Sequence, residues 1–335
     1  MRPTLTEVAG LAGVSVSTAS RAFSDPDRLN DETLARILGA AAQLDYRGRA
    51  RRGGDVASEP TTIGVIVPDI INPIFAEFVR AAQSHGWYRQ QTMMLADTDS
   101  NPQREREILA AIKHRVDGLV VVSPRQNVHD LLRLADGMPL VLVNRESDDC
   151  HTIITDATDG LRQAIGYLAR IGHRRFAYVQ GPELSWTNQR RLATAIDTAE
   201  ELRLQLEVLG WSAENIDGGE AAAASVAASG ATAALVHNDP MAIGVMRGLR
   251  GLGLNVPRDV SVVGVDNTML TQLTSPMLAS VDIPMARAGV LAMDILFDAP
   301  DQPRHEVLTT QFMIGESTAP VRGWRPPQHD EKEIP

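Results

Sequence analysis

The first 46 residues repeat apolar positions at helical spacing in three short segments. In residues 5–12 the apolar side chains fall at i, i+3, i+4 and i+7, which predicts an amphipathic helix. Thr4 is a favourable N-cap for this helix, and Gly13 tolerates the positive φ at which helices often end. The inward face of the helix is expected to hold Leu5, Val8, Ala9 and Ala12.

A second helix is predicted to begin directly after Ser15, which is its expected N-cap, and a third to follow Asn30. Small apolar residues line the inward face of the second helix, so its hydroxyls and Arg21 point outward. Hydroxyls bind phosphates and Arg reads guanine, so this helix-turn-helix arrangement suits a DNA major groove, although a generic helical hairpin has the same spacing. The inward positions are Ala19, Ala22 and Phe23, then Leu34, Ile37, Leu38, Ala41 and Leu44.

From residue 61 the pattern changes to short runs of Val, Ile and Leu separated by helical segments. Such runs are typical of parallel strands that are covered by helices on both faces. Roughly 260 residues of this kind exceed one sheet, so the sequence predicts an α/β fold of two doubly wound parallel lobes behind a small all-α head. The predicted strands lie within 61–69, 92–99, 116–123, 139–145, 151–156, 175–181, 204–210, 232–239, 259–267, 278–282 and 308–314.

Several of these strands end abruptly in polar residues, which are candidates for a binding site. Ligands of open α/β sheets bind beyond the carboxyl ends of the strands, and between two lobes those ends form a cleft. The polar residues at the strand ends are Asp69, Asn144, Arg145, Asn238, Asp239, Asp266 and Asn267.

Composition narrows the class of protein. The chain of 335 residues has a single cysteine, Cys150, so no internal disulfide is possible, which fits a reducing cytoplasm. No apolar run of about 18 residues and no signal-peptide core is present, so we expect neither secretion nor a membrane partner. Residues 1–52 hold eight Arg against six Asp and Glu, or +2, whereas the total of −10 leaves −12 for the remainder. A basic head on an acidic body indicates separate tasks.

The stretch "TLTEVAGLAGVSVSTASRAF", with "DETLARILGAAAQLDY" behind it, resembles the DNA-binding head of LacI/GalR family transcription regulators. The resemblance implies that Val16, Ser17 and Arg21 read bases and that neighbouring hydroxyls contact the DNA backbone. It implies a palindromic operator bound by a homodimer or higher oligomer, which we expect to form through segments 72–83 and 284–296. The implied DNA-binding set is Thr4, Ser15, Val16, Ser17, Thr18, Ser20, Arg21, Arg28, Arg49 and Arg51.

The body resembles the regulator core of the same family, which is similar to periplasmic sugar-binding proteins, in "IGVIVPDIINPIFAEFVRA", "GHRRFAYVQGP" and "VSVVGVDN". The resemblance implies an effector, expected to be a carbohydrate, between the two lobes, with Trp186 or Trp211 as a flat platform. The implied effector set is Asp69, Phe75, Asn144, Arg145, Thr187, Arg191, Trp211, Asn238 and Asp266. The implied domains are a head (1–46), a hinge linker (47–60), an N-terminal lobe (61–157 and 284–306), a C-terminal lobe (158–283 and 307–320) and a tail (321–335).

These features predict a sequence-specific transcription regulator, most simply a repressor, under the allosteric control of a small effector. Two alternatives remain at this point: the same architecture responding to a protein partner or a phosphometabolite, and a transporter's solute-binding protein. No catalytic constellation is visible, so we do not expect an enzyme or a cofactor. The eight histidines include no i, i+4 pair, so we expect no metal site.

The linker departs from the family pattern. It carries Arg47, Arg49, Arg51 and Arg52, which are interpreted either as contacts to phosphates or a narrow minor groove, or as part of a solvated tether. Gly48 and Arg49 stand where the family usually has Pro-Asn, and Asp55 stands where a leucine usually wedges between bases. A carboxylate does not intercalate in this way.

We therefore predict that this protein bends its operator less than its relatives do. A circular-permutation gel assay, with a family member that carries the wedge leucine as the reference, measures the bend directly. A bend as large as that of the reference would contradict the prediction.

Overall fold

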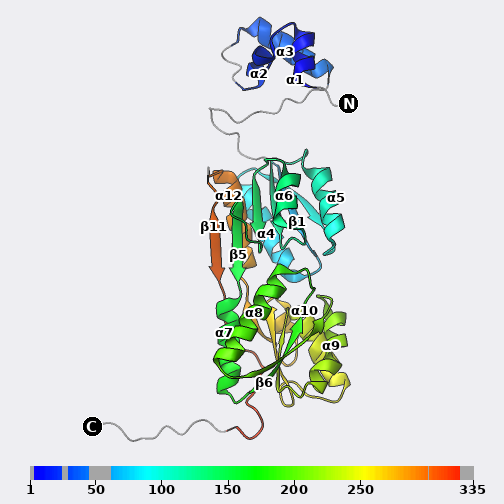
Figure 1. The fold of residues 1–335 in the computed structure, drawn as a ribbon, viewed down its shortest axis with the longest axis vertical. Coiled ribbons are helices and arrows are strands. Elements are labelled where there is room, and N and C mark those ends of the chain that lie inside the picture. Colours follow the sequence, from blue (N-terminus) through cyan, green and yellow to red (C-terminus); the bar gives the residue numbers. More distant parts are fainter. Residues whose placement is uncertain (1–3, 25–28, 45–61, 301, 325–335) are drawn as a thin grey trace, which may run out of the picture. The chain divides into compact units, whose positions relative to one another are not determined.

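The computed structural model describes residues 4–24, 29–44, 62–300 and 302–324, in two units divided between Glu59 and Pro60 (Figure 1). The linker and the predicted contacts Arg28, Arg49 and Arg51 lie outside the described residues. Among the residues described, no helix combines the length and the apolar character needed to cross a membrane.

The head is built from three helices whose ends are fixed by local caps. In α1 (Leu5–Ala12), Thr4 accepts a hydrogen bond from the Glu7 backbone while the Glu7 carboxylate accepts one from the Thr4 backbone N–H. Gly13 ends the helix at φ 65°, as the sequence predicts. The Thr18 N–H donates to Ser15 Oγ at the start of α2 (Val16–Ser24), and the Thr33 N–H donates to Asn30 Oδ1 at the start of α3 (Asp31–Gln43).

A small core holds these helices together. Val8 of α1, Ala19 of α2 and Ile37 of α3 are fully buried, and Val14 fills the corner between the first two helices. The inward prediction for Leu38 is wrong, because 45% of this residue is exposed. Leu38 directly follows Ile37 in α3, so its side chain points about 100° away from that of Ile37. It therefore lies outside the apolar face of α3 that packs against α1 and α2.

The rest of the described chain forms two six-stranded sheets, each in its own lobe (Figure 1). The sheet of the N-lobe has the order β11-β5-β4-β3-β1-β2, and every pair in it is parallel. The strands are β1 (Thr62–Val67), β2 (Thr92–Asp97), β3 (Gly118–Val122), β4 (Leu140–Val143), β5 (His151–Asp156) and β11 (His305–Thr309). The helices are α4 (Pro73–Tyr88), α5 (Pro102–Ile112), α6 (Val128–Ala135) and α12 (Met285–Asp298).

The C-lobe repeats this plan with the order β12-β10-β9-β8-β6-β7. All its pairs are parallel except β10 with β12, which is antiparallel. The strands are β6 (Arg175–Gln180), β7 (Gln205–Trp211), β8 (Ala233–Val236), β9 (Ser261–Asp266), β10 (Ala279–Asp282) and β12 (Gln311–Met313). The helices are α7 (Thr158–Arg170), α8 (Trp186–Glu201), α9 (Ile216–Ala228), α10 (Asp239–Gly251) and α11 (Leu270–Leu273).

Alternate residues of each central strand pack on opposite faces, which explains the continuous apolar runs. Val65 and Val120 face α4 and α12, whereas Ile66 and Val121 face α5 and α6. Because both faces of a parallel sheet are covered, neither set of positions tolerates polar side chains. The predicted α/β architecture with a helical head is therefore confirmed.

Within the described residues the chain crosses between the lobes three times, along one edge of both sheets. The crossings run from β5 to α7, from β10 to α12 and from β11 to β12. The single strand predicted over 308–314 is in fact two strands, because the chain leaves the N-lobe sheet at Thr310. The lobes therefore exchange after Thr309 and not between residues 306 and 307.

Close helix packing in the C-lobe gives a stability prediction. A Cβ on Gly244 of α10 would collide with the Ile216 carbonyl oxygen of α9, whereas a Cβ on Gly166 of α7 would meet nothing within 4 Å. We expect Gly244→Ala to lower the free energy of unfolding by about 1–3 kcal/mol, because backbone cannot move aside as a flexible side chain can. Gly166→Ala is the matched control, and it should leave the free energy of unfolding unchanged or raise it by up to about 1 kcal/mol. Equal denaturation midpoints for the two variants would contradict the packing shown.

Candidate functional site

The outward surface of α2 is the candidate DNA-reading surface. Val16 is 44% exposed, Ser17 and Arg21 are exposed, and Ala19 and Ala22 on the opposite side are buried. These residues therefore lie on the faces of α2 that the sequence predicts for them. The side chain of Phe23 is not among the described ones.

Two predicted backbone contacts, Thr4 and Ser15, serve as N-caps in this structure. The Ser15 hydroxyl lies 2.8 Å from that of Ser17 and 2.7 Å from that of Thr18, so the start of α2 is a cluster of hydroxyls. Ser20 is half-buried on the same helix. Hydroxyls at a helix N-terminus lie beside backbone N–H groups and the positive end of the helix dipole, an arrangement suited to phosphate oxygens.

The second candidate site is a cavity between the lobes. Both lobes contribute to its wall, with α4, the ends of β3 and β4 and the start of α12 on one side, and α8, β8 and β9 on the other. Of the predicted effector residues it brings together Phe75, Asn144, Thr187, Arg191, Asn238 and Asp266. It adds residues outside the predicted effector set: Asn72, Ile74, Ser123, Arg125, Glu214, His237, Ile283 and Met285.

Asp266 and Arg191 form one ion pair of this wall. Asp266 ends β9 at φ 119° and accepts from Arg191 Nη2 at 3.3 Å, while Arg191 Nη1 donates to the His237 carbonyl at 2.6 Å. Burial raises the pKa of Asp266 well above its ordinary value, and the Arg191 charge opposes that rise. The hydrogen bond from Arg191 fixes the Asp266 carboxyl group in the wall of the cavity.

Two asparagines are held in defined orientations. The Asn144 side-chain oxygen accepts from the Thr155 N–H at 2.9 Å and from its hydroxyl at 2.8 Å. The Asn238 oxygen caps α10 by accepting from Met241 N–H at 3.0 Å, so its amide N–H₂ group is directed away from the helix and donates to the Glu214 carbonyl at 3.3 Å. Fixed amides of this kind recognise hydroxyls with little loss of side-chain entropy.

A second ion pair joins the lobes. Arg125 Nη2 lies 2.5 Å from Glu214 Oε1, and their side chains are 3% and 13% exposed. Burial alone raises the pKa of Glu214, but His237 and the Arg125 charge outweigh it and bring the pKa to about 2. Burial lowers the pKa of His237 to about 4, so the ring is neutral at pH 7 even though Glu214 Oε2 lies 3.7 Å from its Nε2.

Three predicted effector residues do not line the cavity. Asp69 accepts from the Ile71 N–H at 2.8 Å and so closes the turn after β1. Arg145 is half-buried beside Glu105, and Trp211 is 59% exposed on the edge strand β7. Their predicted contacts with the effector have no support from these positions.

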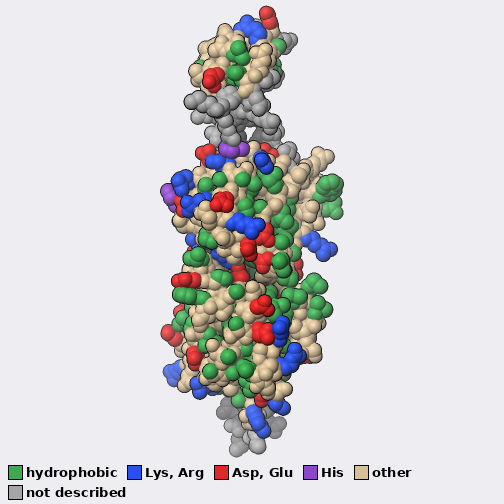
Figure 2. Space-filling model, turned by 90° about the vertical axis from the view of Figure 1, so that its right-hand side faces the viewer, with side chains coloured by type: hydrophobic (Ala, Val, Ile, Leu, Met, Phe, Trp, Pro, Cys, Tyr) green, Lys and Arg blue, Asp and Glu red, His purple; other side chains and the backbone are tan. Residues whose placement is uncertain are grey.

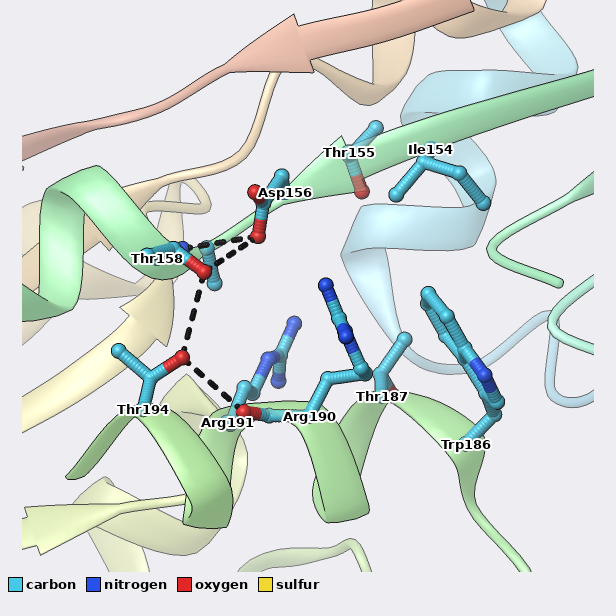
Figure 3. A pocket seen from close by; sticks show the side chains of 10 residues that line it. Ile154, Thr155, Asp156, Thr158, Trp186, Thr187, Arg190, Arg191 and Thr194 are labelled. Atoms are coloured by element: carbon cyan, nitrogen blue, oxygen red, sulfur yellow. Dashed lines mark hydrogen bonds between the residues drawn. The ribbon is translucent and has the colours of Figure 1, made fainter. Parts of the chain in front are cut away.

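Trp186, the other candidate platform, lines a neighbouring cavity (Figure 3). The Arg190 guanidinium lies 5.5 Å from the centre of its indole ring. On the opposite wall Asp156 accepts from the Thr158 hydroxyl at 2.7 Å, and Thr187 and Arg191 line both cavities. Among the side chains that the structure describes, no group of three His, Cys, Asp or Glu is placed to hold a metal ion.

The neutral His237 leads to a pH prediction. Between about pH 6.5 and pH 4 the unfolded chain protonates this ring and the folded chain does not, so the unfolded state binds more protons and stability falls on acidification. The wild type should lose roughly 3 kcal/mol more than His237→Asn across this window. Urea unfolding of both proteins at pH 7 and pH 4 measures the difference. If the unfolding free energies of the wild type and His237→Asn differed by the same amount at pH 7 and pH 4, the lowered pKa assigned to His237 would be contradicted.

Comparison with known proteins agrees with the division of the chain into a DNA-binding head and an α/β core. Residues 4–48 match the model for bacterial regulatory proteins of the lacI family, and residues 165–318 match the periplasmic binding protein-like domain. The transcriptional repressor PurR of Pasteurella multocida is 30% identical over 312 residues, which cover 90% of this chain and 93% of that protein.

Solved structures resemble the whole core. A LacI family regulator from Enterococcus faecium with bound ribose has a TM-score of 0.71 and 26% identity, covering 78% of this chain and 100% of its own. The complex of the transcriptional regulator CelR with cellobiose has a TM-score of 0.70 and 25% identity, covering 94% and 100%. With its helix-turn-helix head and its cleft between two α/β lobes, this chain belongs to the lacI family of DNA-binding transcription regulators.

Proposed function

We propose that this protein is a repressor that binds a palindromic operator as a homodimer and is controlled by a neutral carbohydrate in the interlobe cavity. The proposal rests above all on the α2 surface, where Val16, Ser17 and Arg21 face outward from a helix whose other side is buried. Its relatives are transcription regulators, and we place its action in the cytoplasm, without catalysis.

In this proposal the side chains of the head divide into two groups. Thr4, Ser15, Thr18 and Ser20 position the head on phosphates, together with the N-terminal N–H groups of α2. Arg21 donates to the O6 and N7 atoms of a guanine, and Val16 contacts a thymine methyl group. A single small head buries little surface, so two heads on one dimer are needed for tight binding to both halves of a palindrome.

The dimer is proposed to form through the N-lobe. The apolar faces of α4 and α12 pack on each other within the chain, since Phe78 and Gly289 meet there. That leaves their outward faces for the partner. Trp87 and Tyr88 at the end of α4 are 77% and 87% exposed, and large exposed aromatic side chains are frequent at protein interfaces.

The charges in the cavity favour a neutral effector. Both arginines of its wall are already paired, Arg125 with Glu214 and Arg191 with Asp266. An anionic effector such as a phosphometabolite would have to compete with these buried carboxylates, whereas a neutral polyol adds hydrogen bonds and leaves both pairs intact. The similar structures with bound ribose and cellobiose support the carbohydrate class.

Arg21→Ala should weaken operator binding by about 1–3 kcal/mol and relax base preference at one position of each half-site, because a bidentate guanine contact is lost. Gln43→Ala, an exposed position on α3, is the control and should leave affinity unchanged. Fluorescence anisotropy with single-base operator variants measures both effects. An unchanged affinity for Arg21→Ala would remove this residue from the reading surface.

Asp266→Asn should abolish the response to the effector and spare operator binding. Asn is close in size and tolerates positive φ, so the fold is kept while the acceptor pair for two hydroxyls and the charge opposite Arg191 are lost. Thermal-shift screening of ribose, xylulose, cellobiose and glucose identifies the probe sugar. A variant that responds to that sugar as the wild type does would exclude Asp266 from the site, and no shift with any sugar would contradict the carbohydrate class.

A further inference from the structure

The order of the strands gives the interlobe cleft one joined edge and one open edge. The three crossings lie beside β5 and β11 in the N-lobe and beside β10 and β12 in the C-lobe. At the opposite edge the sheets end in β2 and β7, and no described segment of the chain passes from lobe to lobe there. Figure 1 shows α5 and α9 above one another on this open side. Lobes joined in this way separate most at the open edge when they rotate about the crossings.

The ion pair between Arg125 and Glu214 joins the two lobes on the side of the cleft that faces this open edge. Arg125 follows β3, and Glu214 lies between β7 and α9. Ser100, which follows β2, donates its hydroxyl to Glu214 Oε1 at 2.7 Å and accepts from Arg125 Nη2 at 3.3 Å. Three side chains from the two lobes thus share one buried contact. Figure 2 views this side of the molecule and shows acidic and basic side chains near one another across its middle.

Each partner of the ion pair is held by its own lobe. On the N-lobe side the buried carboxylate of Glu105 accepts hydrogen bonds from two backbone groups, the N–H of Arg125 at 2.9 Å and the N–H of Gln126 at 3.1 Å. On the C-lobe side the Glu214 carbonyl accepts from Asn238, and the next residue, Asn215, caps α9. When the lobes move apart, Arg125 and Glu214 therefore move apart with them and the ion pair breaks. The ion pair thus restrains the angle between the lobes.

We propose that Arg125, Glu214 and Ser100 form a latch across the open edge of the cleft, which holds the lobes closed and must open for an effector to enter or leave. This inference builds on the proposed effector function, because Arg125 and Glu214 also line the cavity. The Glu214 carboxylate is ionised at neutral pH, in keeping with its pKa of about 2. Loss of either partner leaves a buried charge uncompensated, so the remaining partner favours the open, hydrated arrangement.

Distances between spin labels on the two lobes test the latch without any effector. The full-length chain carries Cys150→Ser and labels at Gln103→Cys on α5 and Asp217→Cys on α9, both exposed positions beside the open edge. Double electron–electron resonance then compares this protein with Glu214→Gln, Arg125→Lys and the exchanged pair Arg125→Glu with Glu214→Arg. Arg162→Met, which breaks the exposed pair with Glu201 inside the C-lobe, is the matched control.

The latch predicts a longer or broader distance distribution for Glu214→Gln, a smaller change for Arg125→Lys and partial return of the original distribution in the exchanged pair. The control should match the parent protein. A distribution that stays the same in Glu214→Gln, in a variant that keeps its circular dichroism spectrum, would overturn the latch. Because no sugar is present, this result is independent of whether the protein binds a carbohydrate.

Discussion

Pairing of buried charge is the constraint on which the rest of this structure depends. The carboxyl ends of two parallel sheets meet at one gap, and this brings the ionisable groups Arg125, Arg191, Glu214 and Asp266 out of bulk water. A lone charge at such a depth costs several kcal/mol, so each group needs a partner with good geometry. One pair lies within the C-lobe and the other crosses between lobes. The cavity is therefore lined by polar groups that already have partners, which favours a ligand that offers hydroxyls.

The head obeys a different and more local constraint. Its recognition surface is fixed by caps at the helix ends and by a core of small residues, and these local contacts hold the outward face of α2 in place. Such a head reads DNA by itself only weakly, and its affinity depends on how a second copy is placed. Control by a distant cavity then requires only that the lobe angle alters the placement of the two heads.

Local patterns in the sequence were sufficient for most of the fold. The caps Thr4, Ser15 and Asn30 and the glycine at position 13 are short-range features, so the ends of the helices in the head could be predicted from them. Leu38 was wrongly predicted to be buried because residue spacing alone does not define how much of the α3 surface the two short helices α1 and α2 cover. The segment 308–314 was interpreted as one strand because both halves are apolar, although the chain changes sheets within it.

The cavity could be predicted only in part. The rule that ligands lie beyond strand ends found Asn144, Asn238 and Asp266, since each lies at the end of its strand or within two residues of it. It missed Glu214, which lies three residues after β7 and meets Arg125 only through the packing of two lobes. The resemblance to the family offered Trp211 as a platform, but this side chain is 59% exposed on the edge strand β7 and does not line the cavity. Contacts between lobes have no signature in local periodicity, which is why the cross-lobe pair required the structure.

The most direct test of the whole account is selection of duplexes from a random pool by the full-length protein, with and without the candidate sugars ribose, cellobiose and glucose. The account predicts enrichment of a palindrome whose half-sites contain a guanine, and a change in that enrichment when the cavity is filled. No preferred duplex at low ionic strength in any ligand state would contradict the central claim that a small reading head is controlled from the interlobe cavity.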